Sequence, residues 1–192
     1  RYKHSLWGVV SSHSFIAYES PSYGTDPDET VVLDSLVLSL AFDGRFVGDT
    51  TLQQTLSIYQ LTEKIVLNDN GYLYNNSSVS YAPEALAVCS FKPQPNGGEK
   101  LEVRLPAALG QDLLSRFHAQ DQAVSIVPDL AGSESLLTFT VADSSAALVL
   151  HYHLSDELST EKELWFFPNT DTQFNHIDHD RSGTDMAGYP MK

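Results

Sequence analysis

Hydrophobic and polar residues alternate with a period of two along much of the chain. In the segment 33–42 (LDSLVLSLAF), every second position from 36 on carries a large apolar residue: Leu36, Leu38, Leu40 and Phe42. The segment 100–105 (KLEVRL) alternates in the same way, and 55–61 (TLSIYQL) divides its apolar residues between two faces. Such alternation predicts strands with a buried face. Further strands are expected at 86–91, 135–141, 146–154 and 163–167. Turns that contain glycine are expected at 42–49, 94–98 and 128–134.

One segment has the spacing of a helix instead. In residues 106–121 (PAALGQDLLSRFHAQD), the apolar positions fall on one helical face: Leu109, Leu113, Leu114 and Phe117. Pro106 suits the start of a helix, because its ring fixes a helical φ and the missing N–H would have no partner there. Gly110 weakens a helix by about 1 kcal/mol relative to alanine. The sequence therefore predicts one short helix near 106–118.

Many short strands, one helix and frequent turns are typical of a mostly-β protein. We expect an antiparallel β-sandwich of the jelly-roll-like kind, formed as a single domain by all 192 residues. Two stretches, 20–30 and 68–84, have the composition of loops. The second is long enough to be functional rather than a simple connection.

Charge and cysteine content exclude several classes of protein. The formal net charge is −14, from 25 acidic and 11 basic residues, and such a field repels both nucleic acid and anionic membrane surfaces. The only cysteine, Cys89, cannot form an internal disulfide, and its apolar neighbours predict a small buried side chain. No stretch approaches the roughly 20 apolar residues that cross a bilayer. The chain opens without an initiator methionine, so we expect a longer protein trimmed at one or both ends.

Several short sequence segments occur together in an order that is fairly specific to one protein family. They lie at 33–63, 74–93, 101–114 (LEVRLPAALGQDLL), 147–154 (ALVLHYHL) and 174–185 (FNHIDHDRSGTD). In this order the chain resembles the Bacteroidetes lipoprotein family catalogued as domain of unknown function 4270. The resemblance implies an exported cell-envelope protein with a lipid anchor, expected at the outer membrane, and no established activity. The lipid-attachment cysteine is missing here, and no active-site residue is carried over.

The segment 174–185 looks most like a chemical site. Asp178, Asp180 and Ser182 stand at alternate positions before Gly183, as in the opening of a calcium-binding loop. The twelfth position of that loop requires glutamate and is Tyr189 here, so the segment supplies fewer than the about six oxygens that calcium requires. The alternative is a polar turn whose side chains bond nearby backbone groups. The sequence favours that alternative.

Histidines raise the possibility of a zinc site. His176 and His179 stand three positions apart in the same segment, and His151 and His153 share one face of an expected strand. A site would form if all four converged. The alternative is that each pair belongs to an ordinary polar surface, with Tyr152 buried on the opposite face. The sequence favours this alternative, and no metal or other cofactor is expected.

Aromatic residues suggest binding rather than catalysis. Tyr72, Tyr74 and Tyr81 lie among asparagines and serines in the 68–84 loop, a composition suited to stacking on sugars and bonding their hydroxyls. The alternative is a polar loop whose rings are tucked beneath it. Trp165 is expected in the core. No G-x-S-x-G elbow, dinucleotide fingerprint or phosphate-binding loop occurs, so an enzyme is not expected.

The sequence therefore predicts a non-catalytic envelope domain that has a binding or structural role, with glycan as one candidate ligand. One alternative is an assembly partner of other envelope proteins, which would expose an apolar patch or an unpaired strand edge. Another is a metal-assisted hydrolase, which would cluster the histidines. The expected partner is a glycan or another envelope component, and a membrane only through the anchor.

Overall fold

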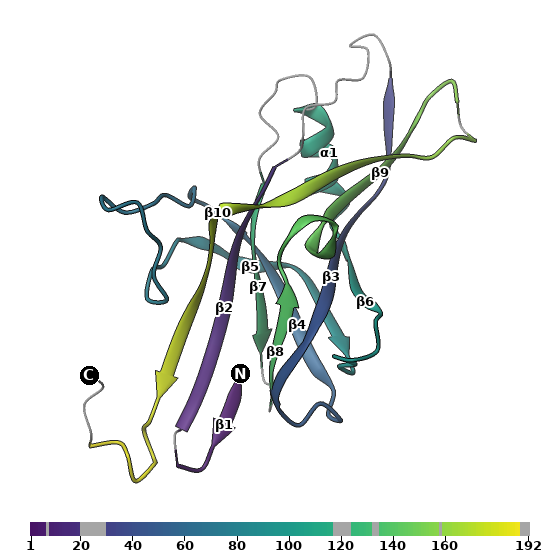
Figure 1. Ribbon diagram of the computed structural model, residues 1–192. Helices are drawn as coiled ribbons and strands as arrows, with labels where there is room; N and C mark the ends of the chain where they lie inside the picture. The colour runs from purple at the N-terminus through teal and green to yellow at the C-terminus, as the bar shows by residue number, and fades with distance from the viewer. Residues whose placement is uncertain (7, 20–29, 117–123, 132–134, 158, 189–192) are drawn as a thin grey trace.

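The computed structural model describes residues 1–6, 8–19, 30–116, 124–131, 135–157 and 159–188 (Figure 1). Its strands are β1 (Tyr2–His4), β2 (Gly8–Glu19), β3 (Val31–Gly48), β4 (Gln54–Leu61), β5 (Tyr81–Phe91), β6 (Lys100–Leu105), β7 (Val124–Ala131), β8 (Ser135–Thr140), β9 (Leu148–Leu154) and β10 (Lys162–Asp180). The helices are α1 (Ala107–Ser115) and the short 3-10 helix η1 (Asp143–Ala146). Within the described residues, all strand pairs are antiparallel.

The strands form one curled sheet in the order β5-β4-β7-β2-β10-β9-β3-β6, with β1 added to β2 and β8 added to β3. The long strand β10 joins the two halves of this sheet (Figure 1). Its first residues, up to Phe166, pair with β9, and the residues from Phe167 on pair with β2. We call the half that contains β2, β4, β5 and β7 the first half-sheet, and the half that contains β3, β6, β8 and β9 the second. The mostly-β, antiparallel and sandwich-like fold predicted from the sequence is confirmed.

The main core lies between the inner faces of the two half-sheets. Leu36, Leu38 and Leu40 of β3 are fully buried there, as their alternation predicted. Leu56 and Ile58 of β4 face them from the first half-sheet. Helix α1 covers one end of this core with three buried leucines: Leu109, Leu113 and Leu114. The predicted helix is confirmed over 107–115, whereas 117 and 118 lie outside the described residues.

A second, smaller core lies on the outer face of the first half-sheet. Its buried residues are Phe15, Leu61 and Ile65. Phe15 of β2 stacks on Phe174 of β10, with ring centroids 4.6 Å apart and an interplanar angle of 4°. Both outer and inner faces of the first half-sheet are therefore partly apolar, which is why 55–61 divides its apolar residues between two faces.

Several predicted boundaries were wrong. The segment 42–49 was expected as a turn but belongs largely to β3, which bends at an irregularity between Phe42 and Phe46. The strand expected at 163–167 continues to Asp180, because β2 supplies a second partner. β1, β2 and β7 were not predicted, and β7 covers part of the turn expected at 128–134. Most of the loop expected at 20–30 lies outside the described residues.

No described helix is long and apolar enough to cross a membrane.

Candidate functional site

Residues 62–80 connect β4 to β5 and lie against the outer face of the first half-sheet. We call this segment the strap. Ile65 is buried in the second core, and Leu73 and Val79 pack against the same cluster. The predicted loop at 68–84 is therefore correct up to residue 80, since β5 begins at Tyr81. Apolar side chains thus attach the strap to the sheet at its start, middle and end.

Two polar contacts fix the middle of the strap to β10. The backbone N–H of Ile177 donates to the carbonyl oxygen of Asn75 over 2.9 Å. Nδ1 of His176 lies 2.8 Å from the carbonyl oxygen of Ser77. A carbonyl oxygen can only accept, so Nδ1 is the donor in this contact. These contacts bind the strap to a strand that is about 100 residues away in sequence.

Two turns shape the exposed part of the strap. Oδ1 of Asn68 accepts hydrogen bonds from the backbone N–H groups of Asn70 and Tyr72, over 3.0 and 2.9 Å. The N–H of Tyr74 donates to Oγ of Ser77 over 3.0 Å. Asparagine and serine side chains commonly hold turns in this way. The backbone on either side of Leu73 is therefore fixed without any strand.

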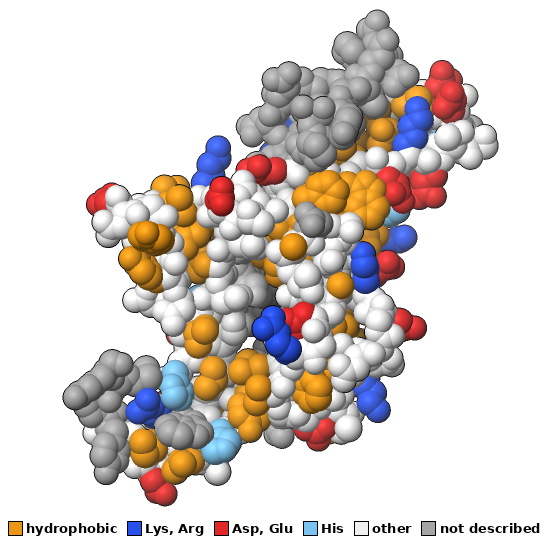
Figure 2. Space-filling model, viewed as in Figure 1, with side chains coloured by type: hydrophobic (Ala, Val, Ile, Leu, Met, Phe, Trp, Pro, Cys, Tyr) orange, Lys and Arg blue, Asp and Glu red, His pale blue; other side chains and the backbone are white. Residues whose placement is uncertain are grey.

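These turns leave two tyrosine rings side by side in solvent. The exposed fractions are 63% for Tyr72 and 50% for Tyr74, and their ring centroids lie 6.5 Å apart at 45°. Hydrophobic side chains gather on the strap where it projects to the left in Figure 2. Tyr81 is different, because it starts β5 and contacts the rings of Phe15 and Tyr59. Of the three candidate tyrosines, the structure therefore brings together only Tyr72 and Tyr74.

The segment 174–185 is part strand and part turn. Residues up to Asp180 belong to β10, so the polar turn expected for this segment is limited to the residues that follow the strand. Oδ1 of Asp180 accepts the N–H of Ser182 over 2.8 Å, as a polar turn predicts, and Gly183 has a φ of 78°. Hydrogen bonds from the side chain and the backbone of Ser182 lower the pKa of Asp180 below its ordinary value of 3.8. Tyr189 lies outside the described residues.

Asp178 lies on the outer face of the sheet between two imidazoles. Its carboxylate is 3.1 Å from Nε2 of His176 and 3.8 Å from Nε2 of His13, which stands opposite His176 in the β2–β10 pair. His13 was not considered from the sequence, because the pairing of β2 with β10 was not predicted. Asp178 therefore faces histidines, whereas Asp180 faces the turn.

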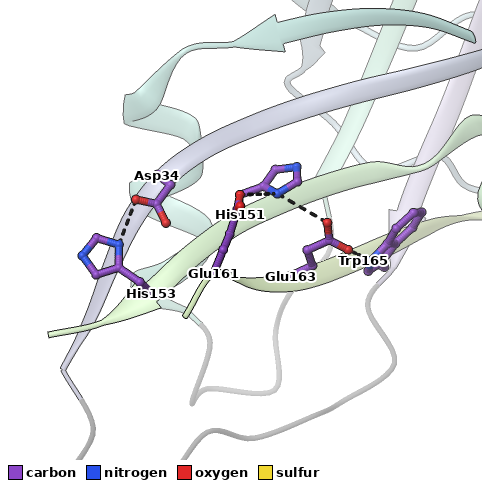
Figure 3. Close-up of polar contacts among 6 residues, drawn as sticks. All are labelled: Asp34, His151, His153, Glu161, Glu163 and Trp165. Carbon is purple, nitrogen blue, oxygen red and sulfur yellow. Dashed lines mark hydrogen bonds and ion pairs between the residues drawn. The ribbon is translucent and has the colours of Figure 1, made fainter. Parts of the chain in front are cut away.

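The histidines of β9 lie on the outer face of the second half-sheet (Figure 3). Nδ1 of His153 lies 2.8 Å from Oδ1 of Asp34, and Nδ1 of His151 lies 3.0 Å from Oε1 of Glu161. Tyr152 between them is buried on the other face, as predicted. Each imidazole has its own carboxylate partner. This is the arrangement of a polar strand face.

Trp165 belongs to the same outer surface. Its Nε1–H donates to Glu163 over 2.9 Å, and its ring stacks on Phe167 (Figure 3 shows the first contact). The prediction of a core tryptophan was wrong, because Leu164 and Phe166 take the inward positions of β10. Cys89 is half-buried and packs against the main core, close to the environment expected for it.

Among the described residues, no group of three or more histidine, cysteine, aspartate or glutamate side chains could hold a metal ion. His151 and His153 have partners on the second half-sheet, whereas His176 contacts the strap and Asp178 on the first. The convergence that a zinc site requires is not seen in this part of the chain.

A scan against family models, a search of curated proteins and a search of solved structures each found no match.

Proposed function

We propose that this chain is a non-catalytic binding domain of the cell envelope that binds neutral glycans on the strap through Tyr72 and Tyr74. The observation that carries the proposal is the exposure of two adjacent rings on a segment fixed by hydrogen bonds and a buried core. Solvent-exposed rings of this size gain free energy when an apolar surface covers them. The C–H faces of sugars offer such a surface.

The surroundings of the two rings favour a sugar over a purely apolar ligand. Asn75, Asn76 and Ser78 are exposed on the same strap and offer amide and hydroxyl groups. Because the turns fix the backbone before binding, little conformational entropy is lost when a ligand is bound. The net charge of −14 disfavours acidic polysaccharides. A neutral glycan is therefore the proposed ligand.

The envelope location and the absence of catalysis are parts of the same proposal. They rest on the resemblance to the envelope lipoprotein family and on the lack of a recognisable catalytic motif. A lipid anchor outside this chain would place the domain at the outer membrane surface, where glycans are abundant.

A second candidate function is assembly with another envelope protein. Val66 is 73% exposed on the strap, and its neighbour Leu67 is also exposed. Exposed apolar side chains beside tyrosines are typical of protein interfaces as well. A protein partner would require Val66 and Leu67 in addition to the rings, whereas a glycan requires the rings alone.

Screening against an array of neutral and acidic oligosaccharides tests the proposal. We expect binding to a neutral class, weakened about fivefold by either Tyr72→Ala or Tyr74→Ala, since one ring contact contributes about 1 kcal/mol. Val66→Ala separates the two candidates, because it should leave glycan binding unchanged. Val88→Ala, at an exposed position of β5, is the matched control. Binding that is unaffected by both tyrosine variants would contradict the proposal.

A further inference from the structure

The inner faces of the two half-sheets separate at one end and leave a cavity of about 270 Å³. The surface is hollowed between the positions of β2 and β8 in Figure 2. Leu40 and Leu56, both fully buried, contribute to its wall from the main core. Leu136 and Leu137 of β8 line another side, and Ile177 of β10 lies opposite them. The wall is therefore largely apolar, as in most small-molecule sites.

The inward positions of β2 change character where the cavity begins. Ile16 and Tyr18 are buried in the main core, but the preceding inward positions, Ser12 and Ser14, are hydroxyl residues that line the cavity. Polar groups on an inward face lower stability unless they form hydrogen bonds. The change from apolar to hydroxyl side chains predicts that this part of β2 faces water or a ligand with polar groups, and not apolar side chains alone.

The hydrogen-bonding capacity of the cavity is only partly used. Oγ of Ser14 donates to Oδ1 of Asn175 over 2.6 Å. Within the described residues, the hydroxyls of the half-buried Ser12 and the exposed Thr138, which also line the cavity, form no hydrogen bond to another protein group, and the amide nitrogen of Asn175, an exposed residue, has no protein acceptor. One hydroxyl or carbonyl group inside the cavity could bond to any of these three.

Volume and charge limit the ligand. An apolar cavity of roughly 150 Å³ binds benzene, so about 270 Å³ suits a molecule with on the order of ten non-hydrogen atoms. Among the lining residues that the structure describes, Arg1 alone is charged, which disfavours a cation, and the net charge of −14 disfavours an anion. The ligand that fits is therefore uncharged.

We propose that this cavity binds a small uncharged amphiphile, with an apolar body and one terminal hydroxyl or carbonyl group. The apolar body lies against Leu40, Leu56 and Leu137, and the polar group bonds near Ser12 and Asn175. This site is separate from the tyrosines of the strap, which lie on the outer face, and does not depend on the proposed glycan binding.

Titration of the protein with 1-butanol, 1-hexanol and 1-octanol, followed by the methyl resonances of Leu137 and Ile177, tests the proposal. We expect saturable shifts and an affinity that rises about threefold to fourfold per added methylene, because each buried CH₂ contributes about 0.8 kcal/mol. Absence of saturable shifts up to 1-octanol would mean that only water fills the cavity and would overturn the proposal. So would saturable shifts confined to the strap.

Two variants distinguish this site from others. Ile177→Trp fills the cavity from its rim and should weaken 1-octanol binding at least tenfold, whereas the control Val88→Trp on exposed β5 should not. Ser12→Ala keeps the cavity open and should weaken binding about fivefold through the lost hydrogen bond. Unchanged affinity in both cavity variants would overturn the assignment. Tyr72→Ala should have no effect, so failure here and failure of glycan binding are distinguishable.

Discussion

Asp180 and Ser182 form the turn that ends β10, and His176 connects that strand to the strap. The first contact is local and the second joins residues 99 positions apart, and both are made by side chains that the sequence marked as candidate metal ligands. Asp180 accepts the backbone N–H of Ser182 over 2.8 Å, and His176 meets the carbonyl oxygen of Ser77 over 2.8 Å. At the scale of single residues, the polar ending of the chain thus holds the backbone in place.

The pKa of Asp180 gives the first prediction. Its carboxyl has a pKa below the ordinary 3.8, chiefly because the side chain and then the backbone of Ser182 donate to the ionised form. The stabilisation is fully present above pH 3.8 and is lost as pH falls through the lower, folded-state pKa. An NMR titration that follows the side-chain carboxyl of Asp180 should show a pKa below the ordinary 3.8 in the folded protein. Ser182→Ala should raise the pKa of Asp180 part of the way back, and an unchanged pKa would contradict the role of the hydroxyl.

His176→Ala should loosen the strap without unfolding the sheet. Losing one partly buried hydrogen bond costs about 1 kcal/mol, so the amide of Ile177, which bonds to Asn75, should exchange with solvent about fivefold faster. His153→Ala is the control, because its partner Asp34 lies on the second half-sheet. Equal exchange rates for Ile177 in both variants would show that His176 does not hold the strap.

At the scale of elements, Gly8 at the start of β2 allows a close approach of its backbone to the end of β10. Its φ is 86°, and a Cβ added there would lie 2.1 Å from the carbonyl oxygen of Asp180. Gly183 has a similar φ of 78° but no atom within 4 Å of an added Cβ. Strand β2 therefore needs glycine for space as well as for conformation, whereas the turn at Gly183 needs it for conformation only.

This pair gives a matched prediction. Gly183→Ala should lower the free energy of unfolding by about 1 kcal/mol, the cost of a left-handed conformation for alanine. Gly8→Ala should lower it by roughly 2 kcal/mol more, because the end of β10 must move. Urea denaturation followed by circular dichroism measures both. If the two variants lose similar amounts of unfolding free energy, the end of β10 can move away from a side chain at position 8 without loss of stability, which would contradict this prediction.

The elements that could be predicted from the sequence are those that bury only one of their faces in the main core. β3, β6 and α1 bury a regular set of leucines, so their patterns indicate type and position. β2 could not be predicted, because its inward side passes from Ile16 to Ser14 and its outward side carries Phe15 beneath the strap. Both faces are therefore mixed. Strand β10 is long, and His176 lies opposite His13, because β10 pairs with β2. The alternation of residues within one segment does not show which strand pairs with it.

At the scale of the whole molecule, the curled sheet separates three surfaces with different chemistry. The outer face of the second half-sheet pairs histidines with carboxylates. The outer face of the first is covered by the strap and its two tyrosines, and the gap between the halves encloses the cavity. Within the part of the chain that the structure describes, the strap carries the two most exposed aromatic rings, together with amide and hydroxyl groups on a fixed backbone. The net charge of −14 disfavours acidic ligands there.

The most direct measurement is isothermal titration calorimetry of a neutral hexasaccharide, taken from the class selected by the array, with the wild-type protein and the Tyr72→Ala/Tyr74→Ala double variant. The account predicts saturable binding to the wild type and an affinity at least tenfold weaker in the double variant, while Val88→Ala binds as the wild type does. Equal heats of binding in the wild type and the double variant would contradict it.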